Sequence, residues 1–341
     1  MFDLGLYLDL PLIWAMIIGF AIFVYVILDG FDLGIGILFP FAPSDDCRNR
    51  MISSIAPFWD GNETWLVLGG GGLLAAFPMV YSIAMPAFYL PIISMLLALI
   101  FRGVSFEFRF KASGKMKKFW DYCFHFGSLI AAFSQGLILG GFLEGVHVTN
   151  NKFSGVTFDW LSWFSVCCGI AIVFSYALLG STWVIMKTCG KTNEWARRVT
   201  SYVGMYVFFF AGMISLFAPL LNNYIFDRWF NWNYVFFIAW LPILVVVGFI
   251  YLYKTLFSLT EKNEYMPFCI TIGLFTLLCL GFVFSIWPYI LPYSVTIWEG
   301  AASSRSQSLL LVGALIVIPI MLIYIGYSYY VFRGKTDIHG Y

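Results

Sequence analysis

The segment VYVILDGFDLGIG, residues 24–36, continues an apolar run yet carries two aspartates, Asp29 and Asp32. The run itself, Leu12–Leu28, approaches the length of about 20 apolar residues that a helix needs to cross a hydrocarbon core. Residues three apart lie on one face of a helix. The segment therefore predicts a membrane helix with two acids on the same face near one end.

The composition assigns the whole chain to the membrane. Of the 341 residues, 61% are hydrophobic and 11% are charged, whereas soluble domains contain about 45–50% and about 25%. Only helices and closed barrels satisfy their backbone in lipid, and the apolar runs are too long and too unalternating for barrel strands. The net charge of +1 gives no reason to expect nucleic acid as a partner.

The apolar runs predict an all-α membrane protein of nine transmembrane helices within a single domain, residues 1–341. The second and third spans come from one run, divided at Pro78 and Pro86 because it is too long for one crossing. The predicted spans are Leu12–Leu28, Trp65–Phe77, Phe88–Phe101, Tyr122–Phe142, Trp160–Met186, Val203–Leu221, Tyr234–Tyr253, Pro267–Leu291 and Leu309–Phe332.

The distribution of basic residues supports this division. Loops on the cytoplasmic side of a membrane protein collect Lys and Arg. With nine spans, sixteen of the 19 basic residues fall on one side. We therefore expect the N-terminus outside and the C-terminus in the cytoplasm. The acidic start, with Asp3 and Asp9, does not resemble a cleavable signal peptide, so the first run is expected to be a retained helix.

Further charged residues gather at the same expected depth. Asp60 and Glu63 repeat the three-residue spacing at the start of the second span, and Arg102 and Glu107 follow the third. A charge at membrane depth costs at least ~2.5–3.5 kcal/mol at the bilayer centre, so it tends to mark a pathway, a cavity or a buried pair. Two interpretations stay open: ordinary interfacial residues with caps and snorkelling side chains, or a water-lined proton path from the cytoplasm.

Other motifs carry little chemistry. The glycine run Gly69–Gly72 lacks the Lys and Ser/Thr of a phosphate loop and favours close helix packing. His125 and His147 are candidate haem ligands, but only His125 lies well inside a predicted span, and a membrane haem usually needs paired ligands. Glu144 near His147 is compatible with a proton exit or a polar turn. The seven cysteines show no C-x-x-C spacing, so neither a disulfide framework nor a metal site is expected.

Four longer motifs resemble subunit II of the cytochrome bd-type quinol oxidases, including the cyanide-insensitive branch. They are DGFDLGIGILFPF, SIAPFWDGNETWLVLGGGGLLAAFPMVY, FRGVSFEFRFK and the late WPYILP with TIWEGAASSRSQ. The resemblance covers nearly the whole chain in order and spacing. It implies two four-helix bundles plus one peripheral helix, pseudo-symmetric with subunit I, in the bacterial cytoplasmic membrane.

The resemblance also implies the complex in which the chain works. Subunit I is expected to hold two haems b and a haem d, or a third haem b, while this chain ligates no cofactor. The complex is expected to oxidise quinol and reduce dioxygen to water. A small single-helix subunit, membrane lipids and a structurally bound quinone in an apolar groove are further expected partners.

The same resemblance implies roles for the acids in proton uptake. Asp60 matches the acid of a motif associated with proton uptake along the subunit interface and is expected to carry protons. Asp29 and Asp32 form a cytoplasmic funnel, and Arg102 is their charge partner. Glu63 and Glu107 are further candidates for the path. A secondary transporter or ion channel with intramembrane carboxylates is the alternative, although neither broken helices nor an internal repeat is visible.

Overall fold

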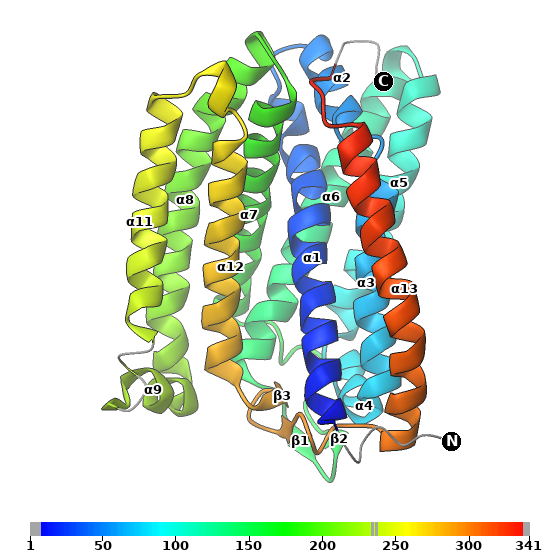
Figure 1. Cartoon of the computed structure of the whole chain (residues 1–341), viewed down its shortest axis with the longest axis vertical. Helices are drawn as coiled ribbons and strands as arrows, with labels where there is room; N and C mark the ends of the chain where they lie inside the picture. The colour runs from blue at the N-terminus through cyan, green and yellow to red at the C-terminus, as the bar shows by residue number, and fades with distance from the viewer. Residues whose placement is uncertain (1–7, 233–234, 236–237, 337–341) are drawn as a thin grey trace.

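The computed structural model describes residues 8–232, 235 and 238–336, and most of them are helical. The helices run side by side along the long axis of the molecule, and the first and last described residues lie at its opposite ends (Figure 1). One end carries the short helix α2 (Asp45–Ser53) and is called the α2 end below. The other carries two small hairpins and is called the hairpin end.

The long helices follow one another with short connections. They are α1 (Leu10–Leu38), α3 (Trp59–Ala76), α4 (Pro78–Ala87), α5 (Tyr89–Lys111), α6 (Gly114–Glu144), α7 (Trp163–Lys187), α8 (Lys191–Leu221), α11 (Trp240–Phe257), α12 (Met266–Ile286) and α13 (Ser304–Val331). The shorter elements are α9 (Asn223–Phe230) and two 3-10 turns, Phe39–Phe41 and Glu261–Asn263. The hairpins pair β1 (Val148–Thr149) with β2 (Lys152–Phe153), and β3 (Tyr289–Leu291) with β4 (Val295–Thr296), both antiparallel.

Eight helices of the described residues are long and apolar enough to cross a membrane. They coincide with eight of the nine predicted spans, although the span predicted at Tyr234–Tyr253 starts among residues outside the description. The remaining prediction, Trp65–Phe77, falls on α3, whose acids and glycines reduce its hydropathy. The chain bends at Phe77 and Pro78, and α4 then follows α3 towards the hairpin end (Figure 1).

Helix α1 is the centre of the packing. It contacts α3, α6 and α7, while α5 packs on α6, α7 on α8 and α11 on α12. Glycine allows the closest of these approaches: a Cβ on Gly34 would lie 1.8 Å from the backbone oxygen of Tyr176 on α7. One face of α1 is therefore pressed against the backbone of α7.

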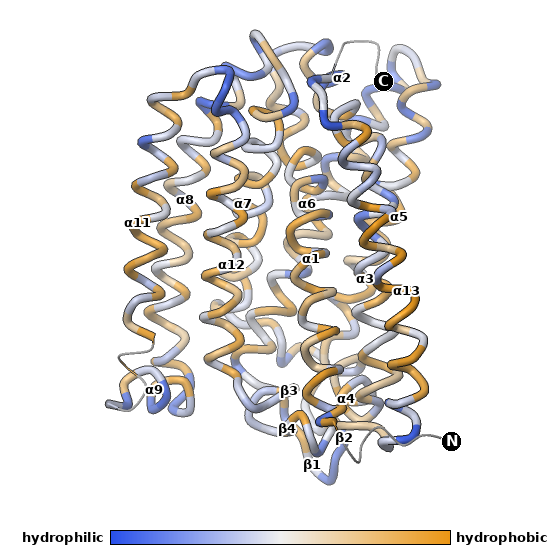
Figure 2. Tube along the Cα trace, in the orientation of Figure 1, coloured by the Kyte–Doolittle hydropathy of each residue, from blue (hydrophilic) through white to orange (hydrophobic). Residues whose placement is uncertain are grey.

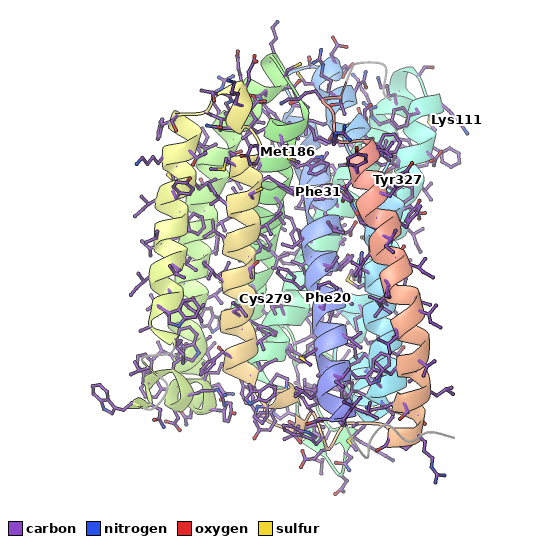
Figure 3. All side chains as sticks on the ribbon, in the orientation of Figure 1. Phe20, Phe31, Lys111, Met186, Cys279 and Tyr327 are labelled. Carbon is purple, nitrogen blue, oxygen red and sulfur yellow. The ribbon has the colours of Figure 1, made fainter. Side chains whose placement is uncertain are left out.

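Polar residues concentrate at the two ends, and the apolar residues cover the length between them (Figure 2). Lys111 lies at the α2 end, whereas Phe31, which is fully buried, lies in the interior (Figure 3). The α2 end also holds the α7–α8 turn and the last described residues of the chain. Of the basic residues, the hairpin end receives Lys152, Arg228 and Arg305.

Helix α13 lies at the edge of the molecule and packs on α1 and α3. Most of its large apolar side chains are exposed, including Tyr327, which is 67% accessible. Its two ends are nevertheless fixed by polar contacts. Near its start, the Gln307 amide donates to the carbonyl of Ala76 (3.1 Å). Just beyond its end, Lys335 is paired with Glu264 in the connection between α11 and α12.

Candidate functional site

Two aspartates on α1 begin the site. Asp29 and Asp32 are both fully buried, and they lie within the long helix as the three-residue spacing predicts. A Cβ on Gly30, between them, would lie 2.9 Å from the Tyr176 ring. Because glycines bring the α7 side of α1 so close to its neighbour, the two carboxyl groups are left to meet α3 and α5.

Arg102 of α5 contacts both aspartates and also Glu63 of α3. Its Nη2 lies 2.6 Å from Asp29 Oδ1 and 3.7 Å from Asp32 Oδ2, and its Nη1 lies 3.1 Å from Glu63 Oε2. The Arg102 side chain is 0% exposed, as are those of the two aspartates, whereas the Glu63 side chain is 30% exposed. These four residues, Asp29, Asp32, Glu63 and Arg102, are called the acid cluster below.

The acid cluster contains more negative than positive groups. Three carboxyls surround one guanidinium, so full ionisation would leave two uncompensated negative charges. Arg109, another buried arginine of α5, is paired with Asp121 at 2.5 Å and does not contribute to this balance. Burial and nearby like charges both favour the neutral form of a carboxyl group. The arrangement is chemically suited to hold at least one exchangeable proton.

Asn62 links the acid cluster to α13. Its Nδ2 donates to Asp32 Oδ2 (2.8 Å), and its Oδ1 accepts from the Tyr329 hydroxyl (3.0 Å). Sequence reasoning missed both residues. Asn62 was visible as part of WDGNE, two residues after Asp60, but the position of Tyr329 depends on a contact between distant parts of the chain, for which the sequence carries no local signal.

Aromatic side chains lie next to the acid cluster. The Phe58 ring stacks on Tyr329, with centroids 4.3 Å apart, and meets Trp183 edge-on at 5.8 Å. The guanidinium of Arg102 lies 5.7 Å from the Trp59 ring. Since Glu63 alone of the clustered acids is partly exposed, it is the acid through which the cluster reaches the surface of the subunit.

The structure does not bring Asp60 and Glu107 into the cluster. Asp60 occupies the first turn of α3 and is exposed, one turn before Glu63. Glu107 is exposed on α5. Neither acid has an ion-pair partner among the described residues. Their predicted participation in a path therefore stays a prediction, and it requires Asp60 to act at the surface of this subunit.

Asp60 heads an exposed stripe of α3. The residues of this stripe repeat at helical spacing and are all exposed; they are Asp60, Thr64, Val67, Gly71 and Leu74. A side chain added at Gly71 would meet no atom of the subunit within 4 Å. Acid, hydroxyl and glycine are poor groups to present to lipid, and small residues are typical of helix-to-helix contacts in membranes.

The two described histidines do not form a haem site. His125, on α6, directs its Nδ1 to the backbone oxygen of Gly36 (3.1 Å). His147 lies beside the first hairpin with its side chain 76% exposed and pairs with Asp159 at 3.3 Å. Within the described residues, no group of His, Cys, Asp and Glu has the arrangement of a metal site. Glu144 accepts a hydrogen bond from Ser162 (2.6 Å), as expected of a polar turn.

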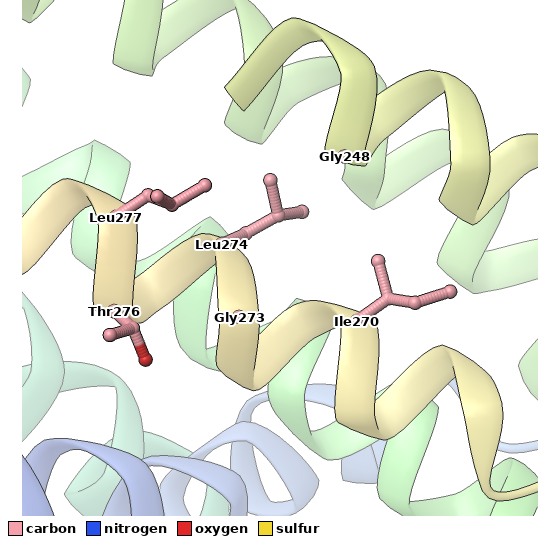
Figure 4. Close-up of a pocket in the computed structure, with 6 residues that line it drawn as sticks. All are labelled: Gly248, Ile270, Gly273, Leu274, Thr276 and Leu277. Carbon is pink, nitrogen blue, oxygen red and sulfur yellow. The ribbon is translucent and has the colours of Figure 1, made fainter. Parts of the chain in front are cut away.

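An apolar groove of about 420 Å³ lies between α11 and α12 (Figure 4). Ile270, Leu274 and Leu277 point toward Gly248 on α11. The hydroxyl of Thr276 is bonded to the Ile272 carbonyl (2.9 Å). The groove therefore suits an acyl or isoprenoid chain rather than a polar headgroup.

Comparison with known proteins gives a consistent result. The family model for cytochrome bd terminal oxidase subunit II matches residues 10–332. Cytochrome bd-I ubiquinol oxidase subunit 2 of Escherichia coli (strain K12) is 28% identical over 96% of this chain and 95% of its own length. Cytochrome bd ubiquinol oxidase subunit 2 of Bacillus subtilis (strain 168) is also 28% identical, over 95% of this chain and 96% of its own.

A solved structure is similar in fold. A chain of the bd oxidase from Geobacillus thermodenitrificans superimposes with a TM-score of 0.73 at 18% identity, covering 95% of this chain and 97% of that chain. The helical arrangement described above is thus shared with a known membrane complex.

Proposed function

Because the chain belongs to the subunit II family of cytochrome bd terminal oxidases, we propose that it conducts protons from the cytoplasm toward a haem-bearing subunit I. Its membership of an oxidoreductase complex and its place as a multi-pass protein of the bacterial inner membrane follow from the family and the apolar helices. The proton path, the partner's cofactors and the orientation are the proposal.

The observation that carries the proposal is the acid cluster. Three carboxyls share one buried arginine, and the partly exposed Glu63 lies one turn from Asp60 on α3. Asp60 takes a proton from water at the α2 end, and Glu63 exchanges it with the buried carboxyls. Glu107 on α5 adds negative charge to the same end and helps to attract protons.

The exposed stripe of α3 is the surface that we assign to subunit I. A stripe with an acid, a hydroxyl and a glycine is less favourable in lipid than an apolar one but suits a close helix contact. In that position Asp60 would lie at the boundary between the two subunits. Protons would then pass sideways to the partner rather than through this subunit to the opposite face.

The remaining elements of the proposal concern the whole complex. Nine crossings, with α3 and α4 counted together, place the N-terminus outside and the C-terminus in the cytoplasm. The arrangement of two four-helix bundles and a peripheral α13 would repeat that of subunit I. Two haems b with haem d, or a third haem b, reside in subunit I, where quinol is oxidised and dioxygen reduced to water. Lipids, a small single-helix subunit and a quinone tail in the α11–α12 groove complete the expected assembly.

The test is a gentle purification of the chain with its bound partners, followed by two measurements on one sample. A reduced-minus-oxidised optical spectrum should show b-type bands, with or without a far-red d band, and quinol should drive oxygen uptake. A colourless, folded, partner-free chain that moves an ion in liposomes would contradict the proposal and favour a transporter or channel.

A further inference from the structure

The two buried aspartates of the acid cluster have different surroundings. Asp29 Oδ1 lies 2.6 Å from Arg102, whereas Asp32 Oδ2 is 3.7 Å from the same nitrogen and accepts from the neutral amide of Asn62. An ionised carboxylate gains most from a short, charge-assisted bond. By this comparison Asp29 is the better partner for Arg102.

A hydrogen-bond chain approaches Asp29 from the interior of the membrane. The Tyr176 hydroxyl of α7 donates to Gln135 Oε1 (2.5 Å), and Gln135 Nε2 of α6 donates to the Tyr25 hydroxyl (2.9 Å). The rings of Tyr25 and Tyr176 are 3% and 1% exposed. Tyr25 precedes Asp29 by one helical turn on α1, and the two side chains interact.

The direction of this chain follows from a count of donors. A phenol has one proton to donate, and an amide donates only through its nitrogen. Since Tyr176 donates to the amide oxygen, the amide nitrogen donates to Tyr25, and the proton of Tyr25 remains for another acceptor. Asp29 Oδ2, which Arg102 does not bind, is buried and has no other partner among the described residues. A buried acceptor without a donor is costly, and the Tyr25 hydroxyl, one helical turn away and interacting with Asp29, is the group available to donate to it.

Asp32 receives no comparable support. Its Oδ1 is buried and accepts no hydrogen bond among the described residues. The groups that face Asp32 are Asp29 on its own helix, Asn62 and Glu63 on α3, Arg102 on α5 and, beyond Asn62, Tyr329 on α13. Only one of them is cationic, and it is closer to Asp29. If Asp32 Oδ1 carries a proton, it no longer needs a hydrogen-bond donor. The same proton removes one of the surplus negative charges of the cluster.

We propose that Asp29 is the permanently ionised partner of Arg102, held by the chain Tyr176–Gln135–Tyr25, and that Asp32 is the carboxyl that takes up and releases the proton. The inference rests on the proposed function and assigns different roles to two acids that are three residues apart in the sequence. Tyr25, Gln135 and Tyr176 are positioning residues. Because an amide is a poor proton conductor, Gln135 also closes the inner end of the site, and protons leave toward α3.

Infrared difference spectroscopy of the purified complex, reduced minus oxidised, tests this division. The wild-type complex should show a carboxyl C=O band that shifts in D2O and is absent in Asp32→Asn. The same variant should keep its haem bands and slow oxygen uptake by about tenfold or more, the order of a lost proton-transfer group. The Asp29→Asn complex should retain the band if it assembles. Loss of assembly is the other expected result for this variant, because it removes one side of a buried ion pair.

Tyr25→Phe tests the same inference without removing an acid. It should add a second carboxyl band, from Asp29, and shift the pH profile of oxygen uptake. Tyr253→Phe is the matched control, because the Tyr253 hydroxyl donates to the Ser201 carbonyl (2.6 Å), remote from the acids. This variant should change neither the carboxyl bands nor the pH profile of oxygen uptake. A merely structural Tyr25 would lower stability without moving the pH profile.

Two outcomes would overturn the division. A band that persists in Asp32→Asn, or that disappears in Tyr25→Phe or Asp29→Asn, would assign the proton to Asp29. A spectrum without an Asp32-dependent band would also contradict the division, even if Asp60→Asn slows oxygen uptake and thereby leaves the proposed function standing. If substitutions at Asp60 and Asp32 both leave oxygen uptake unchanged, the proposed function itself fails.

Discussion

At the scale of single residues, Arg102 decides whether the acid cluster can exist. Its guanidinium is fully buried and lies within 4 Å of three carboxyl groups from two other helices. A planar guanidinium with five donors can serve several carboxylates at once, which an ammonium group cannot do with the same geometry. Among the described residues, Arg102 is the cation paired with these carboxyl groups, so the charge balance of the cluster depends on it.

Replacing Arg102 by leucine should destabilise the complex severely. Removing one side of a buried ion pair costs about 3–5 kcal/mol because the opposite charge is left without a partner. Thermal unfolding of the purified complex measures the effect, with Arg48→Gln as control, since the Arg48–Asp45 pair lies at the surface within α2. Equal melting temperatures for Arg102→Leu and wild type would show that the cluster is neutral without its arginine.

Part of this site follows from the sequence. The spacing of Asp29 and Asp32 and the helix-end positions of Glu63 and Arg102 predicted that these residues lie at one side of the membrane, and the family resemblance implied that Arg102 is the charge partner of the aspartates. The separation of Asp60 from the acid cluster and the contacts of Asn62, Gln135 and Tyr329 were not predicted. They depend on the rotation of each helix about its axis, which tertiary packing sets and which local periodicity does not contain.

At the scale of elements, the contact between α1 and α7 positions both aspartates. This contact depends on glycine: a Cβ on Gly34 would overlap the backbone of Tyr176, and one on Gly180 would lie 2.5 Å from the carbonyl carbon of Gly34. A backbone cannot yield as a flexible side chain does, so any substituent must push the two helices apart. Gly30 and Gly34 are four residues apart, a spacing that is typical of packed membrane helices.

Gly34→Ala should therefore destabilise the subunit by at least ~1–3 kcal/mol, the usual cost of overpacking, and slow oxygen uptake by displacing the acids. Gly19→Ala is the matched control on the same helix, because a Cβ there meets nothing within 4 Å. It should leave the melting temperature unchanged or slightly raised. A harmless Gly34→Ala would mean that α1 and α7 are farther apart than the structure has them.

The exposed stripe of α3 gives a second prediction at this scale. Gly71→Leu fills open space on the subunit itself but should block a close helix contact, so the haem-bearing partner should be lost on purification. Gly212→Leu on α8, which also meets nothing within 4 Å, should retain the partner. Both variants are assessed by the ratio of haem to this subunit in the purified material, and equal ratios would place the docking face elsewhere.

At the scale of the whole molecule, the two ends differ in charge and in their connections. The α2 end carries most of the basic loops, and the hairpin end carries three basic residues. Basic loops remain cytoplasmic during insertion. The acids of the cluster lie nearer the α2 end, so in the proposed orientation they are accessible from the cytoplasm, where the proposed path begins.

The orientation can be checked with a native cysteine. Cys189, in the exposed turn between α7 and α8, should react with a membrane-impermeant maleimide in inverted membrane vesicles. It should not react in cells whose cytoplasmic membrane is intact and whose outer layers let the reagent through. An Asn151→Cys variant, at the β1–β2 turn, should show the opposite pattern in a Cys189→Ser background. Labelling of both sites from the same side would contradict an odd number of crossings between them.

The fold as a whole was the most predictable part of the molecule. Eight of the nine apolar spans appear as helices of sufficient length, because length and hydropathy alone determine such elements. The division between α3 and α4 was harder to predict. The acids and the glycine run of α3 contribute to the site and to contacts with neighbours instead of facing lipid. They lower the mean hydropathy, from which membrane spans are predicted.

The measurement that tests the central claim most directly is quinol-driven oxygen uptake by the Asp60→Asn complex, with haem spectra recorded on the same sample. The proposed path predicts normal haem bands and uptake slowed by about tenfold or more, since asparagine preserves the shape of the side chain but cannot carry a proton. Thr64→Val, one turn further along the exposed stripe, is the control and should keep full activity. Normal uptake in Asp60→Asn would contradict proton uptake through Asp60, the first step of the proposed path.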